Sequence, residues 1–265
     1  AEAAQGTVGN ILHRATRTGM IGAGQLRLIE DGVKRLRQPA RGYRAGMDAA
    51  LLAAAAPVAA GERLFEAGCG AGAVLMQTAA RRTETFLTGL ERDASMARLA
   101  TENAALNGVQ DRIMIRQGDV AAGFRALDLP PFDWAVSNPP FFDDAGALRA
   151  PAEGKRGAWM ADDGLAAWTG LLLKSVREGG RIVVIHRADR LADLLGLLGQ
   201  KAGSFAIRPI HPFADEPAKR VLVHAIKTGR APLRLLPPLV LHDRTGGKHT
   251  PEAEAILRGE AALDW

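Results

Sequence analysis

The chain has 265 residues, of which 47% are hydrophobic and 24% charged, and its formal net charge is +5. This balance is that of an ordinary folded domain and excludes wholesale disorder. The longest unbroken apolar run, Ala49–Ala60, contains Pro57 and is too short to cross a bilayer; the lone cysteine, Cys69, excludes an internal disulfide framework and favours a cytoplasmic protein.

Strands and helices are expected to alternate along most of the chain. The expected strands are Gln25–Glu30, Arg63–Ala67, Phe86–Glu91, Ile113–Gln117, Phe132–Ser137, Arg181–His186, Ala206–Ile210 and Val221–Lys227. The expected helices are Met47–Ala56, Val74–Arg82, Ser95–Asn107, Leu165–Arg177, Leu191–Lys201 and a terminal helix that starts at Thr250. A long loop, Asn138–Gly164, is the first place to look for a substrate site.

Apolar strands that alternate with helices indicate an α/β fold, with a mostly parallel sheet covered on both faces. The last two strands are joined by a short connection, so one of them should run antiparallel. No repeat or linker divides the chain. We expect a single domain, with an N-terminal extension over residues 1–60, a catalytic core over 61–227 and a C-terminal extension over 228–265.

A glycine cluster, Glu-Ala-Gly-Cys-Gly-Ala-Gly, follows the strand Arg63–Ala67 directly. Glycines let the backbone turn tightly and approach a ligand closely, and the next helix offers unpaired N–H groups. Glu91 ends the following strand, where its carboxylate can accept hydrogen bonds from both hydroxyls of a ribose. This pattern predicts a nucleoside cofactor. NAD is a rival, but Glu66 suits a cationic ligand better than a pyrophosphate.

The tetrapeptide Asn138-Pro139-Pro140-Phe141 follows the strand Phe132–Ser137. The prolines fix φ near −65°, so the carbonyls are rigidly aimed. The Asn138 oxygen and a proline carbonyl form two acceptors that suit a planar amino group with two hydrogens to donate. Phe141 offers an apolar face for stacking a planar base or amide. The tetrapeptide therefore predicts transfer to an amino nitrogen, for which a dehydrogenase has no use.

Taken together, residues 25–227 resemble the S-adenosylmethionine-dependent amino-methyltransferases with an Asn-Pro-Pro-aromatic motif, and within them the bacterial tRNA(Val) adenine-N6 methyltransferase family. The resemblance implies a Rossmann-like class I methyltransferase fold, with a seven-stranded sheet that has one antiparallel strand. It also implies S-adenosylmethionine as cofactor and tRNA as partner. His249 stands where the family tail has an aromatic residue, which leaves the subfamily open.

The resemblance also assigns candidate site residues. The expected catalytic residues are Asn138, Pro139, Pro140 and Phe141. The expected cofactor-binding residues are Gly46, Asp48, Glu66, Gly68, Cys69, Gly70, Gly72, Glu91, Arg92, Asp119, Val120 and Asn138. Asp48 is expected near the amino-acid end of the cofactor and Asp119 near its adenine. Each of the two is also a candidate helix N-cap. Cys69 is expected to fill space rather than to act as a nucleophile.

Adenine in RNA is favoured over the other acceptors, because the flanks of the chain are basic and Phe141 or Phe142 can stack an unstacked base. Residues 1–50 carry eight basic and four acidic side chains (+4), residues 201–265 carry ten and seven (+3), and the middle is slightly acidic. Basic flanks attract polyanions such as RNA. The alternatives are a glutamine N5-methyltransferase acting on protein, a DNA adenine-N6 methyltransferase, a small-molecule or O-methyltransferase, and an RNA-binding module without activity. The histidines show no metal-ligand spacing, so no metal is expected.

Overall fold

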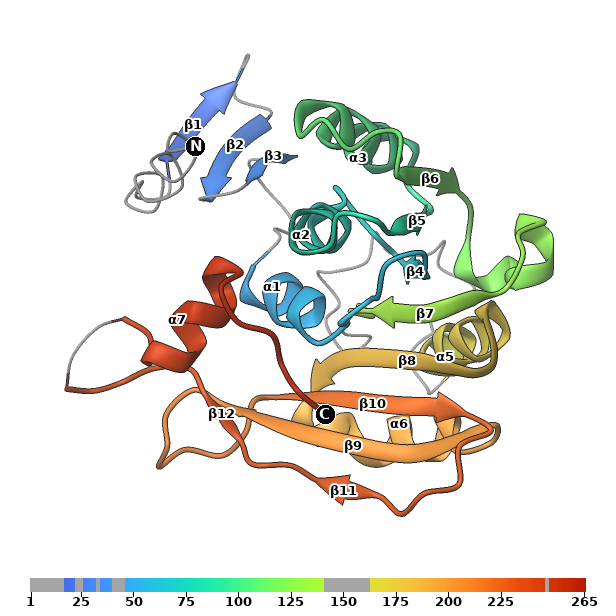
Figure 1. Ribbon diagram of the computed structural model, residues 1–265, viewed down its shortest axis with the longest axis vertical. Coiled ribbons are helices and arrows are strands. Elements are labelled where there is room, and N and C mark those ends of the chain that lie inside the picture. The colour runs from blue at the N-terminus through green and yellow to red at the C-terminus, as the bar shows by residue number, and fades with distance from the viewer. Residues whose placement is uncertain (1–16, 22–25, 32–33, 40–45, 141–162, 246–247) are drawn as a thin grey trace, which may run out of the picture.

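The computed structural model in Figure 1 describes residues 17–21, 26–31, 34–39, 46–140, 163–245 and 248–265. Within these residues a large mixed sheet forms the centre of the molecule, and the first three described segments form a small antiparallel sheet. No helix in the part described is long and apolar enough to span a membrane.

The large sheet has the strand order β11-β9-β10-β8-β7-β4-β5-β6, with β12 also paired to β9. Its strands are β4 (Arg63–Ala67), β5 (Phe86–Glu91), β6 (Ile113–Gln117), β7 (Phe132–Ser137), β8 (Val176–Arg187), β9 (Ala202–His211), β10 (Arg220–Lys227), β11 (Arg234–Leu235) and β12 (Leu239–Val240). The five neighbouring strands β8, β7, β4, β5 and β6 are mutually parallel, and β10 is antiparallel to both β8 and β9. The predicted Rossmann-like sheet with one antiparallel strand is confirmed, and two two-residue strands extend it beyond seven.

Helices cover both faces of this sheet, as predicted. One face carries α1 (Met47–Ala54), α2 (Ala73–Arg81), α3 (Ala94–Leu106) and α7 (Pro251–Arg258), and the other carries α5 (Asp163–Ser175) and α6 (Leu191–Leu198). Successive residues of a strand serve opposite faces: Leu64 packs with the first group of helices, and Phe65 with the second. Because both faces are buried, the central strands carry apolar residues on both faces.

The boundary between α5 and β8 differs from the prediction. The helix ends at Ser175, and the strand begins at Val176, ahead of the expected Arg181. Val176 pairs with Phe132 of β7, and its carbonyl accepts a hydrogen bond from Lys227 Nζ at 2.9 Å. These long-range partners draw Val176 into the sheet, although its sequence context continues a helical pattern.

The N-terminal sheet comprises β1 (Arg17–Ile21), β2 (Leu26–Asp31) and β3 (Lys34–Pro39), of which the sequence predicted only β2. Two asparagines of α3, one helical turn apart, hold β3 in place. Asn107 and Asn103 each exchange two hydrogen bonds with the backbone of Arg35 and Arg37 respectively, at 2.7–2.9 Å. The two amides thus stand in for a neighbouring strand.

The C-terminal segment folds back over α1. Thr250 caps α7 as predicted, accepting a hydrogen bond from the Ala253 N–H at 3.2 Å. Beyond the helix, the Leu263 N–H donates to the Ala54 carbonyl, and Trp265 Nε1 donates to the Ala55 carbonyl at 2.7 Å. These bonds satisfy the last carbonyls of α1, which a helix end otherwise leaves unpaired.

Candidate functional site

The glycine cluster forms a tight turn between β4 and α2. Gly68, Gly70 and Gly72 have φ of +70°, +54° and +83°, a region that favours glycine. A Cβ on Gly68 would lie 2.2 Å from Cη2 of Trp168. The Gly68 and Cys69 N–H groups both donate to the Leu90 carbonyl, so the turn rests on the end of β5. At these three glycines the loop therefore presents bare backbone, because a side chain would strain the backbone there and at Gly68 would also clash with Trp168.

Glu91 is fixed against this turn. One carboxylate oxygen accepts a hydrogen bond from the Gly70 N–H, and the other accepts from the Asp93 N–H, both at 2.9 Å. Carboxylate oxygens have further lone pairs to offer a ligand beyond these bonds. Glu91 is thus held at the carboxyl end of its strand, where an open α/β sheet binds ligands.

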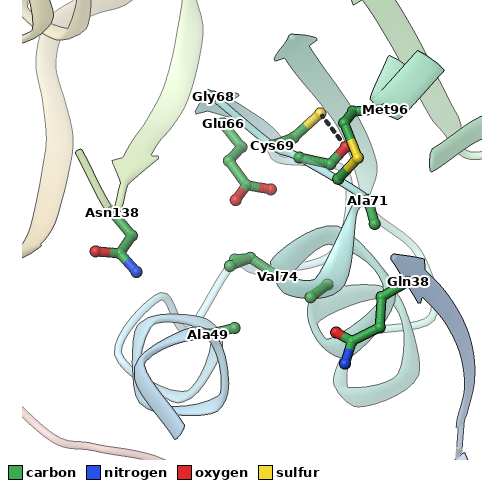
Figure 2. A pocket seen from close by; sticks show the side chains of 11 residues that line it. Gln38, Ala49, Glu66, Gly68, Cys69, Ala71, Val74, Met96 and Asn138 are labelled. Atoms are coloured by element: carbon green, nitrogen blue, oxygen red, sulfur yellow. Dashed lines mark hydrogen bonds between the residues drawn. The ribbon is translucent and has the colours of Figure 1, made fainter. Parts of the chain in front are cut away.

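A pocket opens beside the turn (Figure 2). Its lining comes from β3, α1, the glycine loop, α2, α3 and the end of β7, and consists of Gln38, Ala49, Glu66, Gly68, Cys69, Gly70, Ala71, Ala73, Val74, Met96 and Asn138. Five predicted residues lie together there: Glu66, Gly68, Cys69, Gly70 and Asn138.

Glu66 and Asn138 line the same pocket because their strands are neighbours. Ala67 pairs with Ser137 in the parallel ladder of β4 and β7, and Ser137 Oγ donates to the Ala67 carbonyl at 2.9 Å. Asn138 then leaves the sheet edge with Pro139 buried behind it. Phe141, the fourth predicted catalytic residue, and most of the long loop, residues 141–162, lie outside the described residues.

Burial dominates the electrostatics of the pocket. It raises the pKa of Glu66 well above the ordinary range, and the nearby negative charge of Glu91 adds to this effect. Burial likewise raises the pKa of the Cys69 thiol, with contributions from Glu66 and Glu91. A protonated thiol is a poor nucleophile. A Cβ on Gly89 would lie 2.6 Å from Cys69 Sγ, so the sulfur fills the space above a glycine.

Asp119 and its neighbours form a second group at the same sheet edge. Asp119 accepts a hydrogen bond from the Ala121 N–H at 2.9 Å and caps the short 3-10 turn η1 (Val120–Ala122). This confirms the predicted N-cap; its contact with the cofactor adenine stays a prediction. Arg92 lies 3.7 Å from its carboxylate. The Gly118 N–H donates to the Glu91 carbonyl, so this group lies next to Glu91, outside the lining of the pocket.

Asp48 makes a different contact from either of those expected. Gly46 is the N-cap residue of α1, and Asp48 lies in the first turn without capping it, so the N-cap alternative is wrong. Its carboxylate instead accepts a hydrogen bond from Arg220 Nε at 3.1 Å. Its neighbour Ala49 lines the pocket. A role for Asp48 toward the cofactor stays a prediction.

Gln38 is a pocket residue that the sequence did not indicate. It is 2% exposed and reaches the pocket from β3, a strand that was not expected. Asn103 ties this strand to the glycine loop, because its Nδ2 donates both to the Arg37 carbonyl and to the Ala71 carbonyl, each at 2.9 Å. The N-terminal sheet therefore completes one wall of the pocket.

We expect Asn103→Ala to lower the free energy that holds β3 against the glycine loop by about 1–3 kcal/mol. The substitution leaves the carbonyls of Arg37 and Ala71 without their donor. Asn107→Ala is the matched control, because Asn107 holds β3 without a bond to the glycine loop. Hydrogen exchange should speed up in β3 in both variants, whereas exchange in residues 68–72 should speed up only with Asn103→Ala. Equal exchange rates for residues 68–72 in the two variants would contradict the role of Asn103 in linking β3 to the glycine loop.

Among the described residues, no three His, Cys, Asp or Glu side chains gather where they could hold a metal ion. The pocket instead offers a glycine-rich turn, the buried carboxylate of Glu66 and the amides of Gln38 and Asn138. Its lining within the described residues includes no Lys, Arg or His. These features fit a nucleoside ligand that carries positive charge.

Known proteins resemble this chain in sequence. The methyltransferase small domain family matches residues 44–152. A tRNA1(Val) (adenine(37)-N6)-methyltransferase of Dickeya chrysanthemi is 30% identical over 199 residues, which cover 73% of this chain and 76% of that relative. Relatives of the same name from Yersinia enterocolitica and Aeromonas salmonicida are 36% identical over 110 residues, 41% of this chain. These two matches span 43% and 45% of the relatives' length.

Solved structures agree with the fold. The crystal structure of a predicted O-methyltransferase of Agrobacterium tumefaciens has a TM-score of 0.67 and 29% identity, covering 82% of this chain and 98% of that one. A putative class I S-adenosylmethionine-dependent methyltransferase of Listeria monocytogenes has a TM-score of 0.52 and 14% identity, covering 80% and 68%. At that identity the second likeness concerns the fold alone.

Proposed function

From the premise that the chain belongs to the family of S-adenosylmethionine-dependent methyltransferases that includes the tRNA1(Val) adenine-N6 enzymes, we propose that it methylates the N6 amino group of an adenine in tRNA. The observation that carries the proposal is the position of Asn138, which lines the same pocket as Glu66 and the glycine turn. An amino group held by Asn138 would face a donor seated on that turn. With tRNA as substrate, the proposed activity belongs to the cytoplasm.

The proposed roles follow from the donors and acceptors that the chain presents. The bound cofactor supplies an electrophilic methyl group on a sulfonium. Glu91 accepts hydrogen bonds from the ribose hydroxyls, and Asp119 accepts one from the adenine amino group of the cofactor. Asn138 Oδ1 and the Pro139 carbonyl each accept one N–H of the target amine. Pro139 and Pro140 keep these acceptors rigid, because neither can rotate about φ.

These two hydrogen bonds direct the lone pair of the target nitrogen toward the methyl carbon. Transfer would form a C–N bond as the C–S bond of a bound donor breaks, and the bonding electron pair would stay on the sulfur. The methylated nitrogen is briefly cationic and strongly acidic, so its proton passes to water without a strong base. Alignment of nitrogen, carbon and sulfur accounts for much of the rate, as expected for two reactants held in line.

The test is to supply methyl-labelled S-adenosylmethionine with total tRNA, duplex DNA or a release factor as acceptor. We expect label in tRNA alone, and N6-methyladenosine as the labelled nucleoside after digestion. Label in the release factor would favour glutamine instead, and label in DNA would favour DNA adenine. Tight tRNA binding without any transfer would favour an RNA-binding module and overturn the proposal.

A further inference from the structure

The carboxylate of Glu66 lies at the heart of the pocket without a full set of partners. The residue is 3% exposed, and among the described residues its Oε2 atom is buried with no hydrogen-bond partner. Figure 2 shows the carboxylate pointing into the pocket, with Asn138 and Gln38 on opposite sides of it in this view. A buried carboxylate oxygen without a donor is costly, and the missing donor belongs where a ligand would lie.

The charged groups around Glu66 do not supply that donor. Glu91 on β5 is a second carboxylate, already held by the Gly70 and Asp93 N–H groups. Asp48 on α1 is paired with Arg220 of β10. Cys69 in the loop carries a thiol whose pKa is raised, so it stays neutral. On β3 and after β7, Gln38 and Asn138 are uncharged amides. The described lining thus contains one carboxylate, that of Glu66, and no cationic side chain to pair with it.

We propose that Glu66 holds a proton in the free enzyme and releases it when the positively charged end of the methyl donor binds beside it. The proposal deepens the site of the proposed function, but rests only on the donor and not on tRNA. Burial beside Glu91, which raises the pKa of Glu66, favours the protonated acid in the empty pocket. A cation in contact favours the ionised form, because opposite charges attract strongly out of water.

The consequence is a donor affinity that depends on pH. A ligand whose binding expels one proton gains affinity as pH rises, by up to about tenfold per pH unit while the free acid stays protonated. Glu66→Gln has nearly the same shape but cannot ionise. Its affinity should therefore stay flat with pH, and should fall below that of the wild type at the upper end of the range.

The experiment is isothermal titration calorimetry of the whole chain between pH 5 and 6.5, about one unit or more below the pKa of about 7.7–8.0 at which an α-amino group titrates. Three ligands separate the sources of charge. S-adenosylmethionine carries a sulfonium and an ammonium, S-adenosylhomocysteine carries only the ammonium, and 5′-methylthioadenosine carries neither. Buffers of different ionisation enthalpy count the protons released. Glu84→Gln is the matched control, because Glu84 is exposed at a turn.

We expect proton release with S-adenosylmethionine and none with 5′-methylthioadenosine. Release with S-adenosylhomocysteine would assign the ammonium as the partner of Glu66, and no release would assign the sulfonium. An equal pH slope for all three ligands, or an unchanged slope in Glu66→Gln, would overturn the proposal. If Glu66→Gln does not fold, the wild type with the three ligands still decides. Since tRNA is absent, failure here is distinct from failure to label tRNA.

Discussion

Asn138→Ala is expected to lower the rate of methyl transfer by at least about a hundredfold, the size of effect seen when one positioned polar group is removed from a reaction centre. The proposed function gives Asn138 one of the two acceptors for the target amine. Without it, the nitrogen lone pair is no longer directed at the methyl carbon. The rest of the donor's contacts remain, so donor affinity should change far less than kcat.

Two variants make this prediction specific. Asn138→Asp keeps an acceptor oxygen and should recover part of the lost rate. Gln200→Ala removes an amide from an exposed turn and should leave the rate unchanged. The measurement is single-turnover transfer to tRNA with saturating donor, beside donor binding by calorimetry. A wild-type rate in Asn138→Ala would remove Asn138 from the mechanism.

The sequence predicted the parts of the site that lie on buried strands. β4, β5 and β7 have apolar residues on both faces, so their ends, and the glycines and acids that follow them, could be located without a structure. Parallel strands of one sheet end at the same edge, which made a meeting of Glu66 and Asn138 expected. The structure adds that β4 and β7 are direct neighbours.

Gln38 shows what local pattern could not provide. β3 reads Lys-Arg-Leu-Arg-Gln-Pro, without the β-branched or aromatic residues that mark strands. It is a strand because β2 and the amides of Asn103 and Asn107 pair with its backbone. Those partners on α3 lie more than sixty residues away in the chain. Nothing in the sequence around β3 indicates these partners, so the sequence did not predict that β3 forms a wall of the pocket.

Acidification is expected to unfold the protein through two buried histidines. Burial, with nearby arginines, lowers the pKa of His186 and of His224 to about 4. In the unfolded chain a histidine titrates near 6.5. The unfolded state therefore binds protons first, and stability falls as the pH drops from about 6.5 to 4. One pKa unit is worth about 1.4 kcal/mol, so each histidine should cost about 3 kcal/mol at the acid end.

His224 offers the cleaner test of this effect. It is 6% exposed and stacks on Trp265, with ring centroids 5.1 Å apart. Trp265 in turn donates a hydrogen bond from Nε1 to the Ala55 carbonyl. His224→Phe keeps a ring in this stack but cannot take up a proton. Urea unfolding at several pH values between 7.5 and 4.5 should show about half the wild-type loss of stability. His242→Gln, at a partly exposed site, should keep the full loss. A wild-type pH slope in His224→Phe would mean that acid unfolding proceeds through other groups.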